Sequence, residues 1–133
     1  MQISFIVEEI KIRIRTLAEQ NNFDWFYKLH QVEIVRAAED LLVYYPNANR
    51  DVIILACWLH DIMHYTAKTP EEIMQVKTNH HIDGAVKARQ ILREFRLPED
   101  MIEQVAKCIE RHRNRDDHTA EAIEEKIVAA ADS

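Results

Sequence analysis

Val52-Ile53-Ile54-Leu55-Ala56-Cys57-Trp58-Leu59 is an uncharged apolar run, and His60-Asp61 follows it at once. A segment that is apolar on every side is typical of a helix buried at the centre of a fold. An imidazole and a carboxylate at its end cost free energy unless both find partners. Two interpretations follow. The two side chains form a hydrogen-bonded pair that closes the helix, or they bind a metal ion together with residues from elsewhere in the chain.

The composition favours a single all-α domain. The chain has 133 residues, 47% hydrophobic and 30% charged, which is an ordinary balance for a globular protein with one core. One glycine and three prolines are too few for the many turns of a β fold. We therefore expect residues 1–133 to form one compact bundle of about five to six helices.

Charge and cysteine content narrow the function. The net charge of -6 argues against binding to a nucleic acid duplex or to a membrane surface. No stretch has the length and apolar character of a transmembrane helix, and the first residues lack the pattern of a signal peptide. Cys57 and Cys108 have no zinc or redox spacing, so we expect reduced core residues in a cytoplasmic protein.

Periodicity and capping residues predict the helices. The first, from Ile3 to Leu17, repeats apolar residues at three and four positions, although residues 10, 12 and 14 also fit the period of a strand. Five others are expected, beginning near Asn22 to Asp24 and ending at about Tyr45, then from Asp51 to His64, His80 or His81 to Phe95, Pro98 to His112, and Thr119 to Asp132. A short helix from Thr69-Pro70 to Val76 is expected in the connector between two of them. The predicted N-caps are Asp51, Thr69 ahead of Pro70, Thr78 or Asn79, and Thr119.

Seven histidines are a high count for so short a chain. His30 lies on an apolar face, where a histidine is more often a satisfied core residue than a ligand. His64 lies four residues after His60 and would project from the same side, or it serves only as a residue favoured by the helix dipole. His80 and His81 fall in the first turn of a predicted helix, which suits neutral, ligating imidazole.

Imidazoles and carboxylates thus recur on separate predicted helices. In chain order they are His30, His60-Asp61, His80 or His81, His112 and Asp132. Helical bundles build metal sites from side chains that converge from several helices. Because the set has no sulfur ligand, it indicates a divalent ion such as Mn, Fe, Co, Ni, Zn or Mg. Periodicity alone does not place Asp132 in a buried site, because it lies off the centre of the apolar stripe of its helix.

The order His…His-Asp…Asp on an all-helical chain resembles the HD-domain superfamily, which is named after that doublet. The resemblance covers about residues 25 to 133. It includes Trp58-Leu59-His60-Asp61-Ile62, and Lys126-Ile127-Val128-Ala129-Ala130-Ala131-Asp132 is similar to the closing helix of the family. It implies an HD-like helical domain in which His30, His60, Asp61 and Asp132 bind a metal ion.

Additional histidines extend the resemblance. His80-His81-Ile82-Asp83-Gly84-Ala85 is similar to the His-x-x-x-Gly-Ala stretch of members with extra histidines, which favours His80 over His81. His112 resembles the next histidine of those members, which can hold two metal ions bridged by the doublet aspartate, here Asp61. The chain has His64 where some nucleotidase members have a glutamate, so no carboxylate base is available at that position.

The resemblance implies a metal-dependent phosphohydrolase that acts on a small phosphorylated substrate such as a nucleotide. A bound divalent ion lowers the pKa of its water and supplies hydroxide at neutral pH. Asp61 would orient that water or act as base, and His64, His80 or His112 would handle the proton and the substrate oxygens. Lys68 and Arg113 are candidates for phosphate contact. Two alternatives stay open: a di-iron oxygenase of the myo-inositol oxygenase type, and a non-catalytic ligand-sensing or interaction domain.

Overall fold

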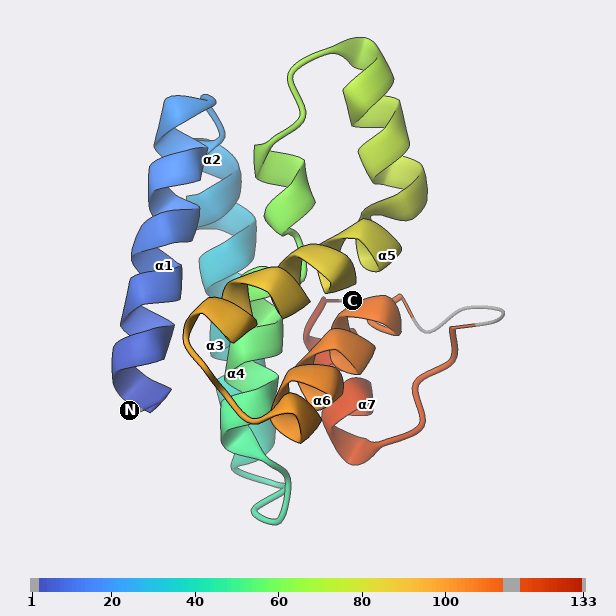
Figure 1. Ribbon diagram of the computed structural model, residues 1–133. Coiled ribbons are helices and arrows are strands. Elements are labelled where there is room, and N and C mark those ends of the chain that lie inside the picture. Colours follow the sequence, from blue (N-terminus) through green and yellow to red (C-terminus); the bar gives the residue numbers. More distant parts are fainter. Residues whose placement is uncertain (1–2, 114–117, 133) are drawn as a thin grey trace.

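The helix α4, Arg50–Leu59, lies at the centre of the fold (Figure 1). The structure is a computed structural model that describes residues 3–113 and 118–132. Every side chain of α4 from Val52 to Leu59 is buried. The helix contacts α1 (Ile3–Gln20), α3 (Val32–Leu42), α6 (Glu99–Glu110) and α7 (Ile123–Asp132). The prediction that the apolar run forms a central helix is therefore confirmed.

The remaining elements are also helical, and the described residues contain no strand. A short helix α2 (Asp24–Phe26) continues through a π-helical turn, η1 (Tyr27–Gln31), into α3. A 3₁₀ turn, η2 (Ile62–Tyr65), follows α4, and the long helix α5 (Pro70–Glu94) packs against α6. The all-α prediction is confirmed. None of the described helices combines the length and the apolar character of a membrane-spanning segment.

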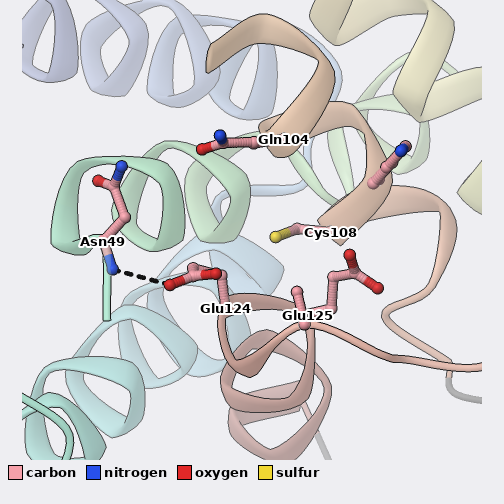
Figure 2. Close-up of a pocket in the computed structure, with 7 residues that line it drawn as sticks. Asn49, Gln104, Cys108, Glu124 and Glu125 are labelled. Atoms are coloured by element: carbon pink, nitrogen blue, oxygen red, sulfur yellow. Dashed lines mark hydrogen bonds between the residues drawn. The ribbon is translucent and has the colours of Figure 1, made fainter. Parts of the chain in front are cut away.

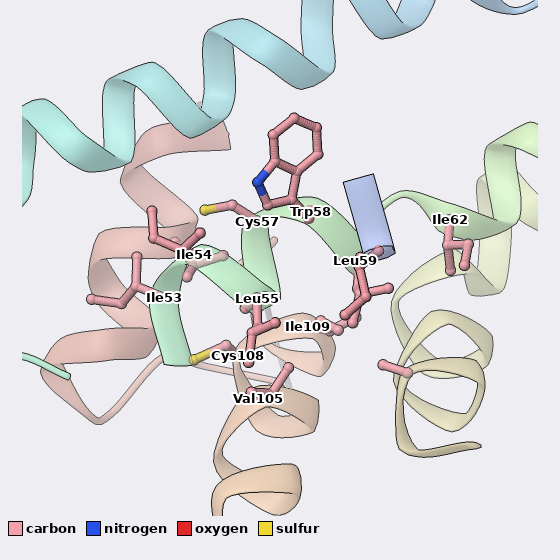
Figure 3. Close-up of a cluster of buried hydrophobic side chains, with 14 of the residues drawn as sticks. Ile53, Ile54, Leu55, Cys57, Trp58, Leu59, Ile62, Val105, Cys108 and Ile109 are labelled. Atoms are coloured by element: carbon pink, nitrogen blue, oxygen red, sulfur yellow. The ribbon is translucent and has the colours of Figure 1, made fainter. Parts of the chain in front are cut away.

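The core forms where α4 meets its neighbours. Figure 3 shows Leu55 of α4 beside Val105 and Ile109 of α6, whereas Trp58 points to another side of the helix. Helix α1 buries Ile6, Ile10 and Ile14 on one face, so the strand period of this segment is not used. Cys57 and Cys108 are buried free thiols, as expected for core residues.

The prediction of two helices between Thr69 and Phe95 is wrong, because α5 runs through Pro70–Glu94 without a break. Thr69 caps its start, with its hydroxyl accepting the N–H of Glu72 at 3.1 Å. Thr78 was expected to cap a new helix, but its hydroxyl donates to the carbonyl of Met74 at 3.0 Å within α5. His80 and His81 therefore lie in the middle of a helix and not in its first turn.

Other predicted boundaries differ for local reasons. The N-cap of α4 is Asn49, not Asp51, and its side chain accepts the N–H of Val52 at 3.3 Å. The same helix ends at Leu59 and gives way to η2, so His64 does not belong to α4. Helix α7 begins at Ile123 rather than at Thr119.

Glu125 stabilises the start of α7. Its Oε1 accepts the N–H of Glu121 at 3.0 Å and a hydrogen bond from Arg111 at 2.8 Å. Burial alone would raise the pKa of Glu125, but the Arg111 guanidinium and these hydrogen bonds outweigh it and lower the pKa. A lowered pKa means that the stabilisation is present above the unfolded-state pKa and is lost as the pH falls through the folded-state pKa.

We expect Glu125→Gln to lower the free energy of unfolding at pH 7 by up to about 1.5–3 kcal/mol, the range for a hydrogen bond to a charged group, because glutamine keeps an acceptor oxygen but loses the negative charge that faces Arg111. The difference from the wild type should shrink between pH 5 and pH 3. Urea unfolding curves at several pH values measure it. A difference that stays constant down to pH 3 would contradict the assignment.

Candidate metal centre

The end of α4 brings His60 and Asp61 together. The helix ends at Leu59, His60 forms its C-cap, and Asp61 leaves the helical conformation with φ -111° and ψ 20°. Both side chains then turn toward one point, with His60 Nε2 3.0 Å from Asp61 Oδ2. Both residues are buried. The doublet thus forms the middle of a cluster of donor groups.

His30 and Asp132 complete a first group of four around the doublet. His30 Nε2 lies 2.9 Å from Asp61 Oδ2 and 3.5 Å from Asp132 Oδ1. His60 Nε2 lies 3.3 Å from Asp132 Oδ1. The four ligand atoms lie within 4.8 Å of one another. The structure therefore brings together all four residues that the family resemblance implied as metal ligands.

The π-helical turn η1 carries His30. A π-helical turn holds more residues than an α-helical turn, and such turns occur often at functional sites. Phe26, at the end of α2, packs its ring against His30 at 4.6 Å and against His64 at 5.6 Å between centroids. His30 is therefore held between an aromatic wall and the carboxylates, and it is not a satisfied histidine of the apolar core.

Asp132 is the last residue of α7, and its side chain is only 21% exposed. The prediction from periodicity left it outside a buried site. Its carboxylate nevertheless reaches the cluster, because α7 packs against α3 and α4 and ends beside His60. At the end of a helix, a side chain can extend beyond the last turn and contact a neighbouring helix even when it lies off the apolar face.

A second group shares Asp61 with the first. Oδ1 of Asp61 lies 3.7 Å from His80 Nε2 and 3.4 Å from His64 Nε2, while Oδ2 faces the first group. His112 Nε2 lies 3.0 Å from His80 Nε2. Asp61, His80 and His112 also have ligand atoms within 4.8 Å of one another. One carboxylate thus stands between two sets of imidazoles.

Backbone carbonyls fix the orientation of three of these imidazoles. Nδ1 of His60 donates to the Cys57 carbonyl at 2.7 Å, and Nδ1 of His80 to the Val76 carbonyl at 3.1 Å. Nδ1 of His112 donates to the carbonyl of Ile109 at 2.5 Å. Each Nε2 therefore faces the centre of the cluster, which is the usual arrangement of metal-binding histidine.

The nitrogens of His80 and His112 face each other in an arrangement that a bound cation would stabilise. Burial and the neighbouring His112 lower the pKa of His80 to about 4. Burial and the charge of His60 lower the pKa of His112 to about 4. Both rings are therefore neutral at pH 7, and with Nδ1 as the donor each Nε2 presents a lone pair to the other across 3.0 Å. A divalent metal ion bound by these nitrogens would remove this repulsion.

The carboxylates set the charge of the first group. Burial alone would raise the pKa of Asp61, but His60, His30 and His64 outweigh it and hold the pKa well below its usual value. Burial likewise opposes the protonation of His60, while Asp61 and Asp132 raise its pKa well above the usual range. A proton on His60 thus balances part of the carboxylate charge that a metal ion would otherwise neutralise.

Gln31 supports the doublet and was not singled out in the sequence. It is fully buried, and its amide donates to the Cys57 carbonyl at 2.5 Å, the same carbonyl that accepts from His60. The hydroxyl of Tyr65 donates to the Gln31 side chain at 3.5 Å. A polar residue beside His30 in the apolar pattern was the available signal, but its partner is a backbone carbonyl that no sequence pattern reveals.

Several predicted residues lie outside the cluster. His81 is buried with Nδ1 unpartnered among the described residues, and its ring lies 5.0 Å from that of His118. Arg113 donates to the Lys77 carbonyl at 2.7 Å. Lys68 is exposed in the loop before α5. Phosphate contacts of Lys68 and Arg113 therefore stay predictions.

A separate hollow of about 410 Å³ lies beside the start of α4 and not near its end (Figure 2). There the N–H of Asn49 donates to Glu124 at 2.9 Å. Burial raises the pKa of the Cys108 thiol in its wall, so this group stays protonated. The Cys108 thiol is therefore no reactive nucleophile, and no residue of the histidine cluster is among those that line the hollow.

The fold and the cluster define an all-helical protein whose buried imidazoles and carboxylates could hold a divalent metal ion. The chain belongs to the HD domain family, which it matches over residues 8–133. No curated protein and no solved structure gives a significant match. Members of the family are often metal-dependent phosphohydrolases. The match begins earlier than the expected residue 25 and includes most of α1.

Proposed function

We propose that the protein is a metal-dependent phosphohydrolase that acts on a small phosphorylated substrate, with a nucleotide as the leading class. The observation that carries the proposal is the position of Asp61, whose two oxygens face two different sets of imidazoles. A carboxylate in this position suits a pair of divalent ions about 3.5–4 Å apart, as in two-metal phosphatases. The first ion would bind His30, His60, Asp61 and Asp132, and the second Asp61, His80 and His112.

A bound divalent ion would lower the pKa of a water molecule and neutralise charge on the phosphoryl oxygens. The chain itself would hold and move the proton. Asp61 would orient the water or accept its proton, and His64 lies 3.4 Å from Asp61 Oδ1. Burial lowers the pKa of His64, so this imidazole is neutral at pH 7 and ready to accept a proton.

Hydrolysis of phosphate esters by metal-loaded protein is the direct test. Purified protein is loaded with Mn, Co, Zn or Mg and assayed against p-nitrophenyl phosphate and a panel of nucleotides. Activity should disappear in His60→Ala. Activity that survives this change would end the proposal, whereas two irons per chain with consumption of O₂ would replace it with the oxygenase alternative.

Metal binding should also stabilise the fold. Removing metal with a chelator leaves the lone pairs of His80 and His112 opposed, so adding the ion back should raise the melting temperature. A site filled at one hundred times its Kd adds about 2.7 kcal/mol to the free energy of unfolding. We expect His112→Gln to lose much of this gain.

The matched control is His118→Gln, because His118 contacts His81 and does not belong to either ligand group. It should keep the whole metal-induced rise in melting temperature. Thermal unfolding monitored by circular dichroism, with and without chelator, measures all three proteins. Equal rises in His112→Gln and the wild type would show that His112 binds no metal.

A further inference from the structure

A mostly apolar hollow of about 290 Å³ lies between η2 and the first half of α5. One wall comes from Met63, Thr66 and Ala67, in η2 and the loop that follows it. The opposite wall comes from α5 and includes Val76, which is buried, and Asp83. Pockets that bind small molecules usually measure about 300 Å³ or more, so this hollow is at the lower end of that range. It has room for one ring or a short chain.

The hollow runs beside the second group of metal-ligand candidates. On α5, Val76 lies four residues before His80, and Asp83 lies three residues after it. Along the helix axis the hollow therefore passes the level of His80. On the other wall, Met63 and Thr66 flank His64, whose ring lies 4.7 Å from that of His80 between centroids. Both imidazoles also approach Asp61, with His64 Nε2 3.4 Å and His80 Nε2 3.7 Å from its Oδ1.

The charges around the hollow have one sign. Glu71, Glu72 and Asp83 are among the residues that line it, and none of its described lining residues is basic. The hydroxyl of Thr69 donates a hydrogen bond to the carboxylate of Glu72 at 3.2 Å. Glu71 and Asp83 form no ion pair with any of the described residues. A group with further phosphates or a carboxylate would meet negative charge here. An uncharged or cationic group would not.

We propose that this hollow binds the organic part of the phosphorylated substrate, and that it selects an apolar group that is uncharged or positively charged. This inference rests on the proposed function, because the phosphate must be held by the metal cluster beside His64 and His80. The apolar floor would bind a ring or alkyl chain, and Glu71 and Asp83 would attract an ammonium group at its far end. The geometry thus favours a phosphomonoester with an apolar or amine-bearing leaving group over one with a chain of phosphates.

Non-hydrolysable phosphonates test the inference without requiring turnover. Metal-loaded protein is titrated calorimetrically with methylphosphonate, benzylphosphonate, 4-(aminomethyl)benzylphosphonate and 4-carboxybenzylphosphonate. The benzyl and aminomethyl compounds should bind at least about tenfold more tightly than the carboxy compound, because like charges across a contact oppose binding. Benzylphosphonate should also bind more tightly than methylphosphonate, which has no ring to place in the hollow.

Two variants locate the effect. Glu71→Gln combined with Asp83→Asn should reduce the preference for the aminomethyl over the carboxy compound by about tenfold, and Met63→Ala should weaken all three benzyl compounds equally. Glu9→Gln, on the exposed face of α1, should leave every affinity unchanged. Equal affinities for the four phosphonates, in a protein that hydrolyses phosphate esters, would overturn this inference alone. Absence of both phosphonate binding and hydrolysis would overturn the proposed function with it.

Discussion

Asp61→Asn should remove metal binding and activity together while the fold stays intact. Changing a group that only supports a ligand costs about 10–100-fold in metal affinity. Asp61 is expected to bind both ions directly, so its loss should exceed about a hundredfold at each site. The change keeps the size of the side chain, and the new amide can still donate to Nε2 of His60. Metal content after dialysis and the rate of phosphate release measure the two effects.

Asp40→Asn is the matched control, because Asp40 is exposed on α3 and belongs to neither ligand group. It should keep the metal content and the hydrolysis rate of the wild type. Circular dichroism should show the same helix content in both variants. If Asp61→Asn retains two equivalents of metal, Asp61 does not bridge the two groups. Retained hydrolysis would remove it from the chemistry.

The central helix could be predicted because its signal is local. In a small helical protein, a run of eight apolar residues without a charge can avoid water only at the centre of the fold. The structure buries all eight. Helix ends were harder to predict. Thr78 has the chemistry of an N-cap, yet its hydroxyl bonds to the carbonyl of Met74 inside α5. The choice between these uses depends on whether the preceding turn stays helical, and the residue itself does not decide it.

The residues of the cluster could be predicted from the order of residue types along the chain. The geometry that brings them together could not be predicted. His30 depends on a π-helical turn, and no motif in its sequence marks the extra residue. The low pKa of His80 was expected from a helix start, whereas burial and His112 cause it in the structure. Asp132 was placed by the family resemblance and not by periodicity, since its contact with His60 spans 72 positions. Contacts of this range are set by packing.

Leu59→Ala should cause the largest loss of stability among single changes near the cluster. Leu59 is fully buried at the end of α4, and Figure 3 shows it on the side of the helix that faces Ile109. Truncating a buried leucine to alanine removes apolar contacts and leaves a cavity, which costs about 2–5 kcal/mol. Since His60 follows directly, the cavity should also loosen the turn that holds the doublet and weaken metal binding.

Leu29→Ala is the matched control, because Leu29 is 75% exposed although it lies beside His30. Its free energy of unfolding should stay within about 0.5 kcal/mol of the wild type. Urea unfolding of metal-free protein isolates the packing effect, and metal titration of the folded variants measures the effect on the cluster. A loss below about 1 kcal/mol for Leu59→Ala would mean that the surrounding helices close the cavity. In that case the rigidity of the His60-Asp61 turn would have to come from its hydrogen bonds, above all from the Cys57 carbonyl shared by His60 and Gln31.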